Sequence, residues 1–174
     1  MRERAHYKKG LVIFMKSYTV NPIGKISVRG GETVIELEKK YIPALTGLEG
    51  FGYIQVLWWF DGCDNETSRS KLTEQFPYKN APDILGTFAT RSPQRPNPIA
   101  LTPAYVTYID HENGIIGLAY IDANDGTPVL DIKPYTPSLD RIEEPTVPAW
   151  CSSWPMSNEE SADFDWSSVF NFEV

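Results

Sequence analysis

The chain has 174 residues, of which 41% are hydrophobic, and its formal net charge at pH 7 is −7. This length and composition suit a single globular domain with a core of its own, and they exclude an intrinsically disordered chain. No apolar run reaches the length of a transmembrane helix, so we expect no membrane partner.

Charge is unevenly distributed along the chain. Residues 1–141 hold all 16 Lys and Arg and 16 of the 23 Asp and Glu, whereas residues 142–174 hold the other seven acids. The body of the protein is therefore close to neutral, and its C-terminal end is acidic. The overall acidity does not exclude a nucleic acid as the partner of the body.

The N-terminal stretch imitates an export signal without matching one. Basic residues precede the apolar run Leu11–Met15, but Lys16 interrupts that run and no cleavage-type end follows. We therefore expect a cytoplasmic protein. Met15 is a candidate natural start, which would leave residues 1–14 as a flexible extension.

Cysteine and histidine are too sparse to predict a metal site. Cys63 and Cys151 lie far apart, and His6 and His111 are the only histidines, so no zinc-binding spacing is present. A disulfide between the two cysteines stays open, but without an export signal two reduced thiols are the default.

The first predicted elements form a hairpin. A strand begins near Tyr18 and runs to Val28, Gly30–Gly31 marks a turn, and Thr33–Glu38 alternates as a second strand does. Residues 41–50 fit one short helical turn.

Residues 51–60 predict the central strand, because the run is dense in aromatic and β-branched residues. Trp58 and Trp59 are either core anchors or platforms for stacking bases, and burial is the commoner use of such side chains. The polar residues 61–83 fit a solvated loop or an irregular short helix, and the segment is long enough to cover a site.

The stretch from Gly86 to Pro103 has an unusual composition. A strand-like run, Ile84–Thr90, leads into Arg91 and Arg95, which are interleaved with three prolines. The prolines restrict the backbone, so the loop loses little conformational entropy when it binds a ligand. Solvated connectors have similar compositions, but the apolar runs on both sides favour a binding loop held by a scaffold.

Two strands are predicted at residues 104–110 and 114–121. Residues 111–114 join them, and Asn113–Gly114 in this turn is a strong hairpin signal. His111 lies in that turn, and we interpret it as a solvated turn residue rather than a catalytic one.

A last strand is predicted at residues 128–135, after a turn at residues 122–126. Strict alternation places Val129, Asp131 and Lys133 on one face of this strand, opposite Leu130 and Ile132. The two charged groups are either an ion pair on a sheet surface or part of a site, and the pattern alone leaves both open.

Beyond Thr136 the strand pattern ends. Residues 137–155 contain four prolines together with Trp150 and Trp154, which predicts an extended segment wrapped over the body by its tryptophans. Residues 157–174 are acidic and aromatic, and they fit a short amphipathic element or a partly ordered tail.

Three blocks of this sequence, Leu45–Ile54, Gly86–Ile99 and Asp125–Tyr135, resemble in order the motifs of the YaeB/TsaA/TrmO family. The characterised bacterial members of that family are S-adenosylmethionine-dependent methyltransferases that modify tRNA. Three motifs in the right order are far more specific than a single short pattern.

The resemblance implies an all-β fold: a small single-domain β-barrel with little helix, a long polar connector and a Pro/Trp-rich C-terminal extension. We assign the TsaA-like barrel domain to residues 15–136, and the wrap and acidic tail to residues 137–174. In the family the cofactor lies near the barrel at a homodimer interface, so a homodimer is also implied.

Matching positions imply the site of the cofactor, S-adenosylmethionine. The expected cofactor-binding residues are Arg91, Ser92, Arg95, Asn97, Asp131 and Lys133. An arginine can clamp the carboxylate of the ligand, and Asp131 can complement its cationic groups. Asp131 and Tyr135 are the expected catalytic residues, because a modest base suffices for an N–H flanked by a carbonyl.

The implied reaction is methylation of the N6 nitrogen of threonylcarbamoyl-adenosine beside the tRNA anticodon, with tRNA as the partner. However, the acidic tail repels phosphates, and the segment after Ile26 lacks the basic pattern of the tRNA-modifying members. Two alternatives stay open: a methyltransferase for a small molecule or another RNA, and a non-catalytic module that binds S-adenosylmethionine.

Overall fold

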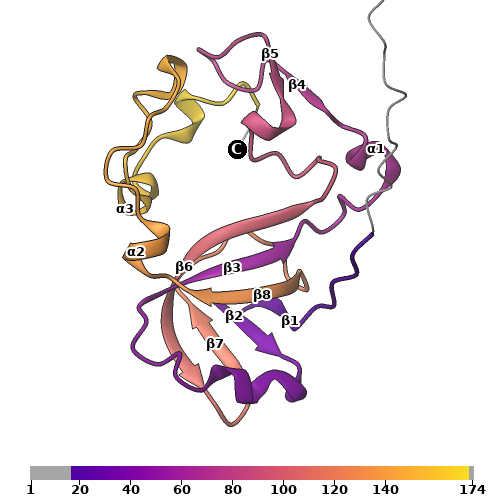
Figure 1. The fold of residues 1–174 in the computed structure, drawn as a ribbon, viewed down its shortest axis with the longest axis vertical. Helices are drawn as coiled ribbons and strands as arrows, with labels where there is room; N and C mark the ends of the chain where they lie inside the picture. Colours follow the sequence, from indigo (N-terminus) through magenta and orange to yellow (C-terminus); the bar gives the residue numbers. More distant parts are fainter. Residues whose placement is uncertain (1–16, 173–174) are drawn as a thin grey trace, which may run out of the picture.

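Six antiparallel strands close into a barrel in the computed structural model, which describes residues 17–172 (Figure 1). The predicted extension at residues 1–14 lies outside the described residues. The order around the barrel is β1-β2-β7-β6-β3-β8. The strands are β1 (Gly24–Arg29), β2 (Glu32–Leu37), β3 (Tyr53–Trp59), β6 (Ile99–Asp110), β7 (Ile115–Leu118) and β8 (Pro128–Pro134). The predicted all-β barrel is confirmed.

The β1–β2 hairpin forms around the predicted glycine pair. Gly30 and Gly31 have φ angles of 62° and 85°, which a two-residue turn of this kind requires and which glycine adopts without strain. The predicted strand start near Tyr18 is wrong, because pairing with β8 begins only at Gly24. Residues 17–22 are exposed, and Pro22 has no N–H to donate to a ladder.

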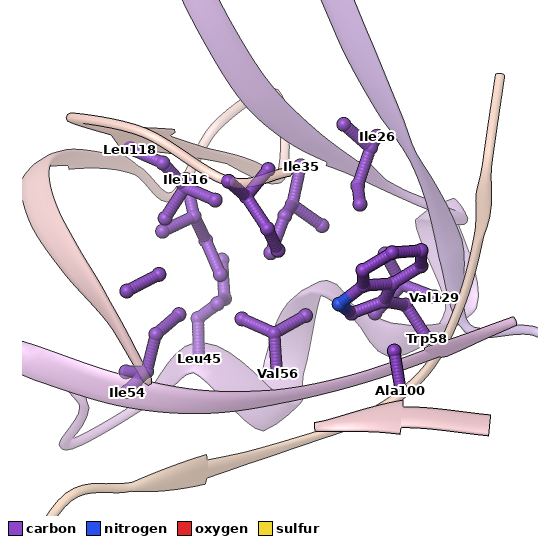
Figure 2. Packing of buried hydrophobic residues seen from close by; sticks show 12 residues of the cluster. Ile26, Ile35, Leu45, Ile54, Val56, Trp58, Ala100, Ile116, Leu118 and Val129 are labelled. Atoms are coloured by element: carbon purple, nitrogen blue, oxygen red, sulfur yellow. The ribbon is translucent and has the colours of Figure 1, made fainter. Parts of the chain in front are cut away.

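The core fills the inside of the barrel (Figure 2). Alternate residues of β3 point into it: Ile54, Val56 and Trp58 are all buried, and β3 pairs with both β6 and β8. The predictions of a central strand and of Trp58 as a core anchor are therefore confirmed. The indole N–H of Trp58 is satisfied, because it donates to Thr102 Oγ1 at 3.0 Å.

A β-bulge interrupts β8. Leu57 pairs with Asp131 and Trp58 pairs with Val129, so Leu130 is the extra residue. The bulge shifts the alternation, and Val129 and Ile132 both pack against the core. The prediction that Val129 shares a face with Asp131 and Lys133 is therefore wrong.

The β6–β7 hairpin turns at the predicted glycine. Gly114 has a φ of 69°, and a Cβ there would come within 2.6 Å of Ile42 Cγ1. His111 is exposed in this turn, as expected, with its Nε2 2.7 Å from Glu49 Oε1. Ile42 belongs to the 3₁₀ helix η1 (Lys39–Leu45), which is the predicted helical turn.

Above the barrel lies a small two-stranded sheet, β4 (Thr73–Gln75) and β5 (Ile84–Gly86) (Figure 1). The helix α1 (Glu66–Arg69) precedes it. The predicted strand at Ile84–Thr90 is wrong beyond Gly86, where the chain enters the 3₁₀ turn η2 (Thr87–Ala89). The Thr90 N–H closes this turn by donating to Thr87 O at 3.1 Å, and the hydroxyl of Thr87 donates to Lys71 O at 3.0 Å.

The C-terminal part of the chain is irregular and lies beside the β4–β5 sheet (Figure 1). Its elements are short: α2 (Pro137–Asp140), η3 (Ala149–Cys151), α3 (Asn158–Ala162) and η4 (Trp166–Ser168). No helix within residues 17–172 is long and apolar enough to cross a membrane. The same residues contain no cluster of three or more side chains that could hold a metal ion.

Candidate functional site

A cavity of about 910 Å³ opens at the mouth of the barrel. Three segments surround it: the adjoining ends of β3 and β6, the connection between β7 and β8, and the loop of residues 90–98, which we call the arginine loop. The polar lining residues are Asp61, Cys63, Thr90, Arg91, Arg95, Thr102, Asp122, Asn124 and Thr127. The volume lies in the range of sites that hold a small organic ligand.

The floor of this cavity is apolar and rigid. Trp58 and Phe60 contact each other edge to face, with ring centroids 4.8 Å apart. Across the β3–β6 ladder, Trp58 pairs with Ala100, which also lines the cavity. A floor that is continuous with the barrel core cannot shift without disturbing that core.

The arginine loop supplies the positive charge. Arg91 and Arg95 line the cavity, and within residues 17–172 neither forms a salt bridge. The Nη1 atom of Arg95 lies 3.4 Å from the carbonyl oxygens of Thr90 and Ser92, so this residue also holds the loop together. The exposed Arg91 guanidinium is the group better placed to meet an anionic ligand.

Two contacts fix the arginine loop from outside the cavity. Arg69 Nη1 donates to the carbonyl oxygen of Pro96 at 2.9 Å. The hydroxyl of Ser92 donates to Glu74 Oε1 at 3.0 Å, and Lys71 pairs with the other oxygen of Glu74 at 3.2 Å. These contacts come from residues 61–83, the segment that was predicted to be able to cover a site. Its first residues, Asp61 and Cys63, line the cavity, and its later residues hold the arginine loop.

The connection between β7 and β8 forms the third wall. Thr127 is fully buried, and its Oγ1 has no hydrogen-bond partner among the described residues. A buried hydroxyl without a partner is unusual, and here it lies on a ligand-sized cavity. Asp125 anchors the wall by accepting a 2.9 Å hydrogen bond from the Val28 N–H, and that bond lowers the pKa of Asp125.

Sequence reasoning did not find this third wall. Asp122 and Asn124 line the cavity with Thr127, but their segment was predicted only as a turn. Asp61 and Cys63, at the end of β3, were missed in the same way. The signal available was position: polar residues immediately follow two buried strands of a closed barrel, at the same end as the arginine loop.

The structure separates the residues expected to share one site. Arg91 and Arg95 line the large cavity, whereas Asp131 lines a second cavity of about 400 Å³, together with residues of η1 and of the segment that follows it. Ser92 and Asn97 belong to the arginine loop but are not in the lining.

The remaining predicted residues lie on β8 or just after it. Lys133 Nζ contacts Asp131 Oδ2 at 2.6 Å, which makes an ion pair along the same strand. The ring of Tyr135 lies 6.3 Å from the ring of Tyr53. Within one chain, therefore, the predicted residues divide between two places.

The fold and this cavity define a closed β-barrel protein with a candidate ligand site at its mouth, lined by two arginines and two aspartates. Residues 14–141 match the family model of the tRNA-methyltransferase O N-terminal domain. The chain belongs to this family, which confirms the resemblance drawn from its three motifs.

Individual relatives agree with the family model. A probable S-adenosyl-L-methionine-binding protein of Methanocaldococcus jannaschii is 37% identical over 71% of this chain and 96% of its own length. The human tRNA (adenine(37)-N6)-methyltransferase is 42% identical over 56% of this chain, but that match spans only 21% of the human protein. The crystal structure of TrmO from Pseudomonas aeruginosa is 28% identical, with a TM-score of 0.58, and the match covers 75% of this chain and 62% of that one.

Proposed function

We propose that this protein binds S-adenosylmethionine in the large cavity and methylates the N6 nitrogen of threonylcarbamoyl-adenosine beside the tRNA anticodon. Family membership supports S-adenosylmethionine-dependent methyl transfer. One observation carries the placement of the cofactor: two arginines without salt-bridge partners among the described residues line a ligand-sized cavity at the barrel mouth. The threonylcarbamoyl group and the anticodon position rest on the family resemblance.

The residues of the cavity fit the chemistry of this cofactor. A guanidinium group binds a carboxylate through charge-assisted hydrogen bonds, and Arg91 is available for that role. Asp61 and Asp122 offer carboxylates to cationic or hydroxyl groups of a ligand. The unpartnered hydroxyl of Thr127 can make a further hydrogen bond.

When bound, the cofactor supplies a methyl group on a positively charged sulfur. The protein's task is then to hold donor and acceptor in line, and alignment alone can lower a barrier by about 7–11 kcal/mol. The rigid aromatic floor and the pinned arginine loop suit that task.

Asp131 and Tyr135 are proposed to assist loss of the acceptor proton, but they do not line the large cavity of their own subunit. We therefore propose a homodimer in which one subunit brings these residues to the cavity of its partner. The proposed place of action is the cytoplasm, where tRNA would be the partner.

A non-catalytic module is the second candidate function. The names of two archaeal relatives favour this function. The relatives from Methanocaldococcus jannaschii and Archaeoglobus fulgidus are named for binding S-adenosyl-L-methionine, and their names mention no reaction. Such a module binds the cofactor but transfers no methyl group to any acceptor.

Calorimetry with S-adenosylmethionine and its demethylated product tests the site first. We expect both to bind wild-type protein and neither to bind an Arg91→Ala variant at the same concentrations. An Arg141→Ala variant is the matched control, because Arg141 is exposed and does not line the cavity. Equal binding by wild type and Arg91→Ala would place the cofactor elsewhere.

A further inference from the structure

The C-terminal lobe, residues 148–172, packs around one tyrosine of the β4–β5 turn. Trp150 stacks on Tyr78 with centroids 5.4 Å apart and an interplanar angle of 13°. Trp154 meets the same ring edge-on at 5.0 Å, and Phe170 lies 5.7 Å from it. This lobe follows the residues that match the family model.

Hydrogen bonds hold the same turn to the lobe. The backbone N–H of Lys79 donates to Val169 O at 2.8 Å, and Lys79 Nζ donates to Ser167 O at 2.7 Å. The side-chain amide of Asn171 donates to Phe76 O at 2.9 Å. Together with the aromatic contacts, these bonds attach residues 76–79 firmly to the lobe.

The turn itself is strained. Phe76 has a φ of 49°, and it is the only residue other than glycine with a positive φ in the described chain from 17 to 172. A bulky side chain disfavours this conformation, which persists only where the surroundings impose it. The bond from Asn171 to the Phe76 carbonyl is one such constraint.

The sheet that carries this turn contacts the arginine loop. The hydroxyl of Ser92, the residue after Arg91, donates to Glu74 Oε1 on β4 at 3.0 Å. Residues 76–79 directly follow β4, so the lobe holds the strand that holds Ser92. Burial raises the pKa of the Tyr78 phenol at the centre of these contacts.

We propose that the C-terminal lobe is a brace that positions the arginine loop for ligand binding, and that it acts through residues 76–79 and Glu74 of β4. The inference rests on the proposed cofactor site. Tyr78 is a positioning residue, because it does not line the cavity. The buried barrel cluster contains no residue of the lobe, so weakening the brace leaves that core intact.

The test uses the full chain with Asn171→Ala, which removes the hydrogen bond to the Phe76 carbonyl, and Trp150→Ala, which removes the stack on Tyr78. Asn21→Ala is the matched control, because Asn21 is exposed and does not line the cavity. Calorimetry gives the Kd for S-adenosylmethionine. We expect Asn171→Ala to raise this Kd about three- to tenfold, as loss of one hydrogen bond does. The melting temperature of the barrel stays unchanged.

A second measurement distinguishes failure of the brace from failure of the cofactor site. In limited proteolysis, trypsin can cleave after Arg91, and mass spectrometry of the peptides gives the rate of this cleavage. We expect faster cleavage there in both brace variants, with unchanged cleavage after Lys39, and saturating S-adenosylmethionine slows the cleavage again.

Each outcome decides one of the two proposals. If wild type does not bind the cofactor, the proposed function fails, and the cleavage rate without ligand still tests the brace. If wild type binds and both variants match it in Kd and in cleavage after Arg91, the brace is overturned.

Discussion

Arg69 Nη1 donates a 2.9 Å hydrogen bond to the carbonyl oxygen of Pro96, which joins the end of α1 to the arginine loop. The same guanidinium lies over the ring of Trp59, 5.5 Å from its centroid, and its Nε pairs with Asp64. One side chain thus links the outside of β3 to the loop that lines the cavity.

Replacing Arg69 with leucine should loosen the arginine loop without removing any group from the cavity. We expect the Kd for S-adenosylmethionine to rise about three- to tenfold, because the loop then loses a charge-assisted hydrogen bond at a partly exposed site. Calorimetry measures the effect, with Arg141→Leu as the control. An unchanged Kd would show that Pro96 is held in place without Arg69.

Cys63 offers a direct probe of the cavity. It lines the cavity and is partly exposed, whereas Cys151 is buried in the C-terminal lobe, and both are free thiols. We expect Cys63 to react with iodoacetamide several-fold more slowly when S-adenosylmethionine is saturating. Peptide mass spectrometry reads both thiols, with Cys151 as the internal reference. Equal rates with and without the ligand would mean that it does not cover Cys63.

The separation of Arg91 from Asp131 predicts complementation between subunits. Arg91→Ala and Asp131→Asn variants should each lose methyl transfer, while a mixture refolded together should regain about a quarter of the wild-type activity per site. That fraction follows because half of the dimers are mixed and each mixed dimer has one intact composite site. Single-turnover assays measure it.

Two results would contradict this arrangement. Full activity of Asp131→Asn alone would remove Asp131 from the catalytic residues. Inactive variants whose mixture stays inactive would place both residues in the same subunit's site or outside the reaction. Refolded wild-type protein is the control for recovery.

The stability of the barrel should depend strongly on the volume of its buried side chains. Ile35 is fully buried on β2 and belongs to the cluster shown in Figure 2. We expect Ile35→Ala to lower the free energy of unfolding by about 3 kcal/mol, as buried aliphatic truncations do. Urea denaturation measures this change. The exposed Leu139→Ala is the control and should cost well under 1 kcal/mol.

The sequence predicted most of the barrel because its strands carry strong local signals. The Gly30–Gly31 and Asn113–Gly114 turns, and the dense apolar run of β3, each have a physical cause that acts over a few residues. The bulge at Leu130 could not be predicted, because it depends on how β8 pairs with β3. The Thr87 hydroxyl likewise bonds to a residue distant in sequence, because it donates to the carbonyl oxygen of Lys71.

The candidate site was only partly predictable for a related reason. Arg91 and Arg95 share one short loop with a distinctive composition, so a local pattern identified them. Asp122, Asn124 and Thr127 reach the cavity only through closure of the barrel, which brings the β7–β8 connection beside β3. The sequence shows that these polar residues follow a buried strand, but it does not show which other strand ends they meet.

The most direct test is methyl transfer to tRNA that carries threonylcarbamoyl-adenosine, followed by mass spectrometry of the digested nucleosides. With wild-type protein and S-adenosylmethionine, we predict that threonylcarbamoyl-adenosine gains one methyl group, and that Arg91→Ala forms none of this product. If the wild-type protein binds S-adenosylmethionine but leaves every nucleoside unmethylated, the proposed reaction is contradicted.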